Sequence, residues 1–208
     1  MKLESITGPD RMGRHKLTFE EGQTLVVYPQ VIADCGLCTG DDLDEEQMER
    51  LRAAATAVRA KMRAVRIVAA SAVSKKDLSQ RLVHKGEDPE QAKDAVQWMS
   101  DLNLLDDSRV AEQVVQRCIS KGYGLQRAKQ ALYEKKVPKQ YWEDALADYP
   151  DQSEKIQDFL RSRLGDEYDE REVKRAIDAL MRRGHSYGQI RKALNQLKLE
   201  QEDFPEDF

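Results

Sequence analysis

The chain has 208 residues, of which 40% are hydrophobic and 35% are charged, and its formal net charge is −4 at pH 7. This composition predicts a globular protein with an extensive hydrated surface. The longest apolar run, VRIVAASAV at residues 65–73, is too short and too basic to span a bilayer, and the opening MKLESITGPD lacks the apolar stretch of a signal peptide. We therefore expect an unprocessed cytoplasmic protein, and the three cysteines, Cys35, Cys38 and Cys118, fit a reducing compartment.

Charge is distributed unevenly along the chain. Residues 50–66 contain six Lys or Arg and no acid, and residues 117–140 contain seven with Glu134 as the only acid. The acids gather at residues 41–49, 166–172 and 200–208. The basic runs are either solvated helix faces or binding surfaces, and the negative net charge argues against a plain nucleic-acid binder.

The residues before position 43 have a strand-like pattern. Leu17 and Phe19 alternate with polar residues, EEG at 20–22 turns the chain, and TLVVY at 24–28 is rich in β-forming residues. We predict a small β-hairpin here, followed by a short helix around PQVIADCGL at 29–37. After residue 43 the apolar periodicity becomes helical.

The helical part repeats itself at offsets of 50 and then 62 residues. The matching positions occupy one face of a first helix and one face of a second helix, as expected for repeats that share a buried side. The matches in the first helix are Lys61/Ala111/Val173, Ala64/Val114/Ala176, Val65/Val115/Ile177 and Val68/Cys118/Leu180. Those in the second are Leu78/Ala128/Ile190 and Leu82/Leu132/Leu194.

The turn between these two helices has its own pattern. Ser74 and Ser186 are each followed three residues later by a side chain that can complete a capping box. The middle copy has Gly122 and Gly124 instead, and we expect their backbone freedom to replace the serine cap. The third helix of the unit should begin at a proline, in EDPEQ and KVPKQ, whereas the acidic tail leaves it little room in the last copy.

These patterns predict a mainly α fold of tandem three-helix repeats in an elongated, curved body, with a small N-terminal β-hairpin segment. The expected divisions are a hairpin extension at 1–43, a first repeat at 44–106, a second at 107–150 and a third with an acidic tail at 151–208. Such a body offers long surfaces rather than deep pockets.

Motifs for catalysis or cofactor binding are absent from the sequence, including the glycine-rich phosphate loops, the zinc helix and the nucleophile elbow. His15, His84 and His185 are far apart and have no cysteine or carboxylate at ligand spacing. We therefore expect no metal, no cofactor and no enzyme activity.

Two pairs of residues invite a chemical interpretation. Cys35 and Cys38 form a C-x-x-C, but TGDD follows, which favours a turn in a small packed segment over a redox motif at the start of a helix. Asp106 and Asp107 stand where a helix should begin, so we expect them to cap it rather than to act as a catalytic acid and base.

The segment LLDDSRVAEQVVQRCISKGYGLQRAKQALYEKKV at 104–137 resembles the signature of the RecX family, bacterial regulators of the RecA recombinase. Residues 74–86 and 181–194 are similar to the family's first and third repeats, so the resemblance covers about residues 55–198. One departure is Lys135-Lys136-Val137, where family members commonly have Lys-Gly-Ile, so this helix must end without glycine. The residues that carry the match are Asp106, Asp107, Ala111, Gly122, Tyr123, Gly124, Arg127 and Leu132.

The resemblance implies a monomeric protein that modulates RecA, chiefly as an inhibitor. Such a protein lies in the groove of the RecA–DNA filament and lowers ATP hydrolysis, strand exchange and coprotease function. The acidic tail is expected to disfavour bare DNA. We expect cations of the last two repeats to meet acidic recombinase surface or DNA. These predicted partner-binding residues are Arg117, Lys121, Arg127, Lys135, Lys136, Arg182, Arg183 and Arg191.

Two other functions stay open. The protein could be a DNA binder, of single or double strands, that affects recombination only by competing for the nucleic-acid backbone. It could also be a helical scaffold with an unrelated partner. Trp98 and Trp142 are expected to pack in the repeat cores rather than to stack on bases.

Overall fold

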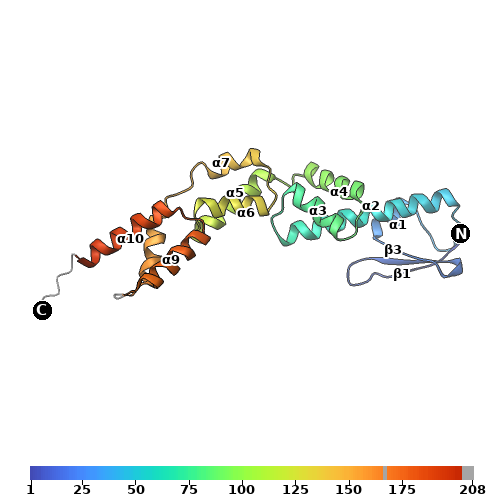
Figure 1. Cartoon of the computed structure of the whole chain (residues 1–208). Coiled ribbons are helices and arrows are strands. Elements are labelled where there is room, and N and C mark those ends of the chain that lie inside the picture. Colours follow the sequence, from blue (N-terminus) through green and yellow to red (C-terminus); the bar gives the residue numbers. More distant parts are fainter. Residues whose placement is uncertain (166–167, 203–208) are drawn as a thin grey trace. The chain divides into compact units, whose positions relative to one another are not determined.

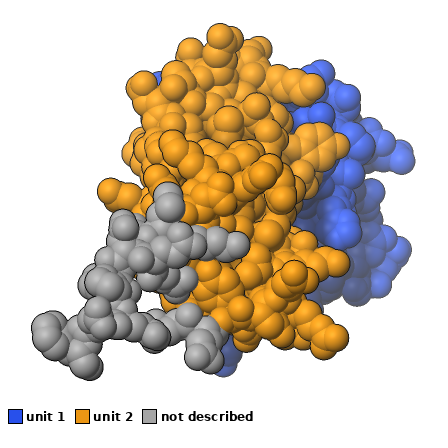
Figure 2. All heavy atoms as spheres, turned by 60° about the vertical axis from the view of Figure 1, so that its left-hand side comes forward, with its two compact units in different colours: residues 1–105 blue, residues 106–208 orange. Residues whose placement is uncertain are grey.

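The computed structural model describes residues 1–165 and 168–202. The chain forms two compact units, Met1–Leu105 and Asp106–Phe208, which are coloured separately in Figure 2. Within the described ranges, no helix has both the length and the apolar character needed to cross a membrane.

The first unit begins with a three-stranded antiparallel sheet in the order β1-β2-β3, formed by β1 (Leu3–Thr7), β2 (His15–Phe19) and β3 (Thr24–Val27). The predicted hairpin corresponds to β2 and β3, joined by the 3-10 turn η1 (Glu20–Gly22), and its alternation buries Leu17 and Phe19. The strand β1 was not predicted. The expected short helix is α1 (Pro29–Asp34).

The long helix α2 (Glu45–Ala70) connects the two cores of this unit (Figure 1). It begins at a capping box formed by Asp44 and Gln47. Its first half contributes Leu51 to the core under the sheet, and its second half contributes Ala60 and Ala64 to a helical core. That helical core is completed by α3 (Lys75–His84) and α4 (Pro89–Asp101).

The second unit contains two further helical cores. The first is built from α5 (Asp107–Ser120), α6 (Leu125–Glu134), the 3-10 turn η2 (Lys139–Tyr141) and α7 (Trp142–Leu146). The second is built from α8 (Ser153–Arg163), α9 (Glu170–Arg182) and α10 (Tyr187–Glu202). The predicted fold class, mainly α with a small N-terminal β segment, is therefore confirmed.

The internal repeat is visible in what each copy buries. The second-helix matches Leu78/Ala128/Ile190 and Leu82/Leu132/Leu194 are all buried. In the first two copies the third helix follows the pair, as α4 and as η2 with α7. In the last copy the helix that packs on α9 and α10 is α8, which precedes them in the chain. Residues 203–208 of the acidic tail and residues 166–167 lie outside the described residues. The four predicted domains stay a prediction.

The capping and packing predictions can be checked residue by residue. Ser74 Oγ accepts the Asp77 amide, and Ser186 and Gln189 bond to each other's amides as a capping box. Pro89 stands in the first turn of α4, whereas Pro138 precedes only the 3-10 turn η2. Both tryptophans pack against repeat cores, as predicted.

Helices α3, α4, α5, α6 and α9 end in the same way. One residue adopts a left-handed conformation, and the amide of the next residue bonds to a carbonyl five residues back, which satisfies the last turn. This residue is Gly86, Asn103, Gly122, Lys136 and Gly184, respectively. Lys136 has a φ of 55°, in a region that side chains with a Cβ disfavour. The missing glycine of the family pattern is thus replaced by a lysine that takes the glycine conformation.

Replacing Lys136 with glycine is expected to stabilise the second unit by about 1 kcal/mol, because the left-handed conformation costs glycine less than lysine. Gly86 occupies the matching position 50 residues earlier with a φ of 85°, so Gly86→Lys provides the reverse change as a control and should destabilise the first unit by a similar amount. Chemical denaturation of both variants measures the two effects. A Lys136→Gly protein that unfolds at lower denaturant than the parent would contradict the expectation.

Candidate partner-binding surfaces

The two glycine-containing turns of the second unit interlock through their backbones. The Gly124 amide donates to the Arg183 carbonyl at 2.9 Å, and the Gln126 amide donates to the Gly184 carbonyl at 3.3 Å. A Cβ on Gly124 would lie 2.1 Å from the Gly184 carbonyl oxygen. We call this contact the turn junction, defined by residues 121–127 and 183–185.

The turn junction corrects the expected role of the glycines. Backbone freedom explains Gly122, whose φ is 66°, but Gly124 has a φ of −76°, which any residue can adopt. Gly124 begins α6 without a side-chain cap, and its missing Cβ is what allows the other turn to approach. The glycine therefore serves packing between repeats rather than a local turn.

His185 is buried within the turn junction. Its Nε2 lies 3.0 Å from the Gly122 carbonyl oxygen, so the ring carries its proton on Nε2 and donates it there. Burial lowers the pKa of His185, the hydrogen bond to Gly122 acts in the opposite direction, and the charge of Arg183 lowers the pKa further. A neutral histidine used as a hydrogen-bond donor has a structural role here. Among the described residues, no group of three or more His, Cys, Asp or Glu is placed to hold a metal ion.

The residues that carry the family resemblance lie in α5 and its N-cap, in α6 and in the turn between them. Asp106 caps α5 by accepting the Ser108 and Arg109 amides, as predicted, and Asp107 is buried in the first turn. Ala111 and Leu132 are fully buried in the core of the second repeat. Tyr123 lies between the glycines, and its carbonyl accepts the Tyr149 hydroxyl at 2.6 Å. Burial raises the pKa of Tyr149 to about 12, so the hydroxyl stays a donor.

Several predicted partner-binding cations meet at the turn junction. Lys121 and Arg127 come from one turn and Arg183 from the other, and the backbone bonds hold the two turns together. The Arg183 guanidinium lies over the Phe159 ring, 4.4 Å from its centre, and Arg127 pairs with Glu134 at 2.9 Å. Stacking and pairing fix these two guanidinium groups while leaving them partly exposed to solvent.

The buried thiol of Cys118 lies close to the charges of the junction. Burial raises the pKa of this thiol, whereas the positive charges of Arg127, Lys121 and Arg117 act in the opposite direction. Arg117 lies in the last turn of α5, which leads into the junction, and we group it with the junction cations. A buried thiol with a raised pKa is a core residue rather than a reactive one, which agrees with its predicted place on the apolar face.

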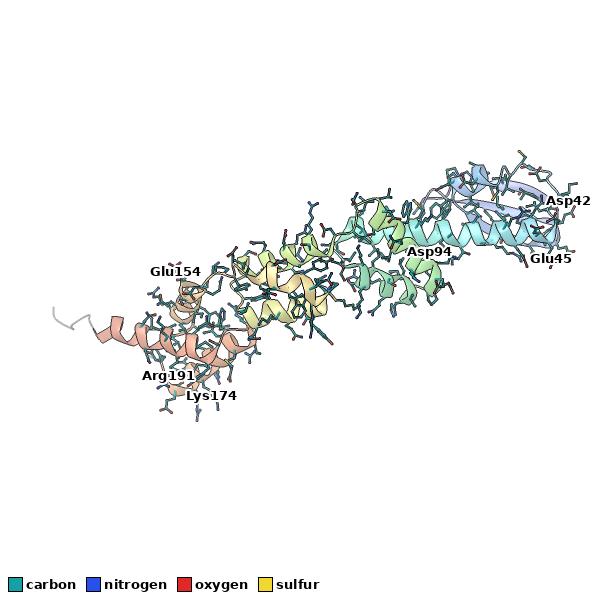
Figure 3. The ribbon with its side chains drawn as sticks, turned by 90° about the horizontal axis from the view of Figure 1, so that it is seen from above. Asp42, Glu45, Asp94, Glu154, Lys174 and Arg191 are labelled. Carbon is teal, nitrogen blue, oxygen red and sulfur yellow. The ribbon has the colours of Figure 1, made fainter. Side chains whose placement is uncertain are left out.

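The remaining predicted cations lie elsewhere in the second unit. Lys135 and Lys136 are half-buried at the far end of α6, and Arg191 is exposed on α10 (Figure 3). Arg182 lines a hollow of about 370 Å³ with Arg163 and Arg175, beside Glu172. Four of the eight predicted residues thus lie at or next to the junction. Arg182 adjoins Arg183 in the chain but lines the hollow, and the other three lie at the end of α6 and on α10.

A second basic surface, in the first unit, was missed as a site. Arg59, Arg63 and Arg66 lie on one face of α2 and line a pocket of about 480 Å³. The sequence signal was the acid-free basic run at 50–66. The run alone does not predict the pocket, because its other walls come from distant parts of the chain.

The C-x-x-C segment forms a turn after α1, as predicted from TGDD. Both thiols, Cys35 and Cys38, are free and exposed. The Cys38 amide donates to the Asp41 carboxylate at 2.7 Å, and the surrounding hollow is lined by Asp34, Asp41 and Asp42. The segment thus forms a turn closed by a backbone-to-carboxylate bond, which agrees with the predicted turn.

Comparison with known proteins identifies the family. The family description "RecX, second three-helix domain" matches residues 106–146. The chain is 30% identical over 128 residues to Regulatory protein RecX of Vibrio parahaemolyticus, covering 57% of this chain and 79% of that protein. It is 31% identical over 134 residues to Regulatory protein RecX of Halorhodospira halophila, covering 62% and 83%.

Solved structures agree in fold. The crystal structure of a regulatory protein RecX matches 93% of this chain and 98% of its own with a TM-score of 0.63 at 20% identity. That of RecX from Lactobacillus salivarius matches 69% and 97% with a TM-score of 0.59 at 20% identity. Sequence relatives that are covered over most of their length, together with the shared fold, show that this chain belongs to the RecX family of regulatory proteins.

Proposed function

We propose that this protein regulates the RecA recombinase by binding the RecA–DNA filament and lowering its ATP hydrolysis, strand exchange and coprotease activity. Family membership supports a regulatory role, and the cations at the turn junction support the choice of this surface as the binding surface. The eight predicted partner-binding residues remain part of this proposal, with the four at the junction placed first.

The junction suits an acidic partner because it concentrates cations that are already positioned. Backbone bonds fix the two turns, so little conformational freedom is lost when Lys121 and Arg183 meet a partner. The patch is positive, whereas the whole chain has a net charge of −4. This difference directs an acidic partner to one surface and disfavours general attraction to polyanions.

A second candidate function is competition for the DNA backbone. The hollow lined by Arg163, Arg175 and Arg182 favours it, because guanidinium groups match phosphate geometry. The two mechanisms differ in their response to salt and to added DNA. Competition for DNA weakens steeply with salt and is relieved by excess DNA, whereas filament contact persists.

The test is DNA-dependent ATP hydrolysis by the cognate RecA, titrated with this protein at two salt concentrations and with a tenfold excess of single-stranded DNA. Inhibition that persists under excess DNA supports filament binding, and inhibition abolished by DNA assigns the competitor role. A Lys121→Glu/Arg183→Glu variant should lose most of the inhibition. Lys93→Glu, on the exposed surface of α4, is a single charge-reversal control, to be compared with Lys121→Glu alone, and should inhibit like the parent.

A further inference from the structure

The pocket in the first unit carries an unusual concentration of positive charge. It has a volume of about 480 Å³, within the range of small-molecule sites in proteins. Its cations come from the loop before β2, from α2 and from the end of α3. They are Arg14, Arg59, Arg63, Arg66, Arg81 and Lys85, and we call the site the arginine pocket.

Carboxylates offset only part of this charge. Among the described residues, the ion-pair partners of the six cations are three acids, Asp10 with Arg14, Asp77 with Arg81, and Glu87 with both Arg59 and Arg63. Six positive charges against three negative charges leave an excess of three. Within the described part of the chain, Arg66 and Lys85 form no ion pair.

Arg66 is held in place by neutral groups. Its guanidinium donates to the Tyr28 hydroxyl at 2.9 Å and to the Met62 carbonyl at 3.2 Å, and it contacts the Met12 sulfur at 3.7 Å. Tyr28 is itself nearly buried, so this wall of the pocket is fixed. A guanidinium oriented by neutral partners keeps its full charge for a ligand.

The placement of three arginines on one helix face is costly for α2 itself. Arg59, Arg63 and Arg66 are spaced four and three residues apart, and like charges at this spacing destabilise a helix. Glu87 compensates two of them, and nothing in the described fold compensates the third. A local conflict of this kind is typical of a functional site.

Apolar side chains complete the lining. Met12, Ile67 and Ala70 stand beside the cations, which gives the pocket an apolar surface next to a charged one. Arginines bind phosphate oxygens through two parallel hydrogen bonds, and a nucleobase or similar ring needs an apolar face. We propose that the arginine pocket binds a small ligand with adjacent phosphates, of the nucleoside di- or triphosphate class, with its phosphates on Arg66 and Lys85 and its base against Met12 and Ile67.

The test measures binding of ATP and of inorganic triphosphate to the full chain, without RecA, by titration calorimetry in 0.15 M salt, where weak surface attraction is screened. Arg66→Gln should lower the affinity for both ligands about tenfold, because a charged hydrogen-bond donor is lost. Arg52→Gln makes the same change on the same helix outside the pocket and should leave the affinity unchanged. Since Arg66 forms no ion pair with any described residue, circular dichroism should show a folded variant, and Lys85→Gln provides a second one.

Three results would overturn the proposal. ATP that fails to bind at millimolar concentration, or that binds equally to Arg66→Gln and the parent, removes the site. If a labelled single-stranded oligonucleotide binds only when Arg66 is present, and ATP does not displace it, the pocket binds a nucleic-acid strand instead. If triphosphate competes with ATP and the oligonucleotide does not displace ATP, the result supports a small polyphosphate ligand. The outcome is independent of any effect on RecA.

Discussion

Replacing Gly124 with alanine is expected to destabilise the second unit by about 3 kcal/mol. The new Cβ would lie 2.1 Å from the Gly184 carbonyl oxygen and 2.5 Å from the His185 nitrogen. Both contacts are with backbone, so no flexible side chain can move aside, and the two turns must separate. Separation also breaks the bonds from Gly124 to Arg183 and from His185 to Gly122.

Hydrogen exchange followed by mass spectrometry localises this effect. Amides of α6 and α10 in Gly124→Ala should exchange faster, while those of the first unit should match the parent. Gly188→Ala is the matched control, because a Cβ there meets nothing within 4 Å and alanine favours the helix. Equal exchange in the two variants would show that the turns do not need this close approach.

The same variant links the fold to the proposed function. If the turn junction presents the cations, Gly124→Ala should also weaken the inhibition of RecA, although it removes no charge. Gly188→Ala should inhibit like the parent. If the turns separate in Gly124→Ala and the variant still inhibits RecA fully, the binding surface lies elsewhere on the protein.

Sequence patterns predicted the local features of the fold because each depends on residues close in the chain. The β2–β3 hairpin, the caps at Ser74 and Ser186, and the buried faces of the helices follow from spacings of two to seven residues. The repeat offsets then carried the same pattern through three copies. Asp106 as a cap and Cys118 as a core residue were predictable for the same reason.

The missed features depend on residues far apart in the chain. The strand β1 is defined by its pairing with β2, where Ile6 faces Leu17, and not by a clear alternation of its own. The position of α8 as the packing partner of α9 and α10 changes the helix order of the last repeat. The role of Gly124 depends on the backbone of Gly184, 60 residues away. Local periodicity contains none of this information.

The arginine pocket shows the same limit at a site. The sequence revealed the basic run on α2, but Lys85, which completes the excess of three positive charges, joins that run only in the folded unit. In the second unit the sequence named eight cations, and the fold places four of them at or next to the turn junction. Charge runs predict which segments are basic, and tertiary contacts decide which residues share a surface.

Replacing Glu87 with glutamine is expected to destabilise the first unit by about 2 kcal/mol. The Glu87 side chain is fully buried and lies 3.1 Å from Arg59 and 2.9 Å from Arg63. Loss of one partner from a buried ion pair costs about 3–5 kcal/mol, and the exposure of both arginines to water lowers that figure. A neutral amide at this position would leave the two guanidinium groups facing each other without a countercharge.

The repeat itself indicates why an acid stands at this position. Val137 occupies the matching position 50 residues later, and both amides bond to the equivalent carbonyl at 3.1 Å. Since a buried valine suffices in the second copy, the helix end does not require a carboxylate. Glu87 is explained by the arginines of α2, which it holds at the wall of the pocket.

Urea unfolding of Glu87→Gln against Glu90→Gln measures this contribution. Glu90 is exposed and lies 4.0 Å from Lys93, so its substitution should change the free energy of unfolding by less than about 0.5 kcal/mol. If the two variants unfold alike, Glu87 does not stabilise the arginines. Glu87→Gln could also be less stable than the parent and bind ATP more tightly. In that case Glu87 stabilises the fold by neutralising arginines that would otherwise bind an external anion.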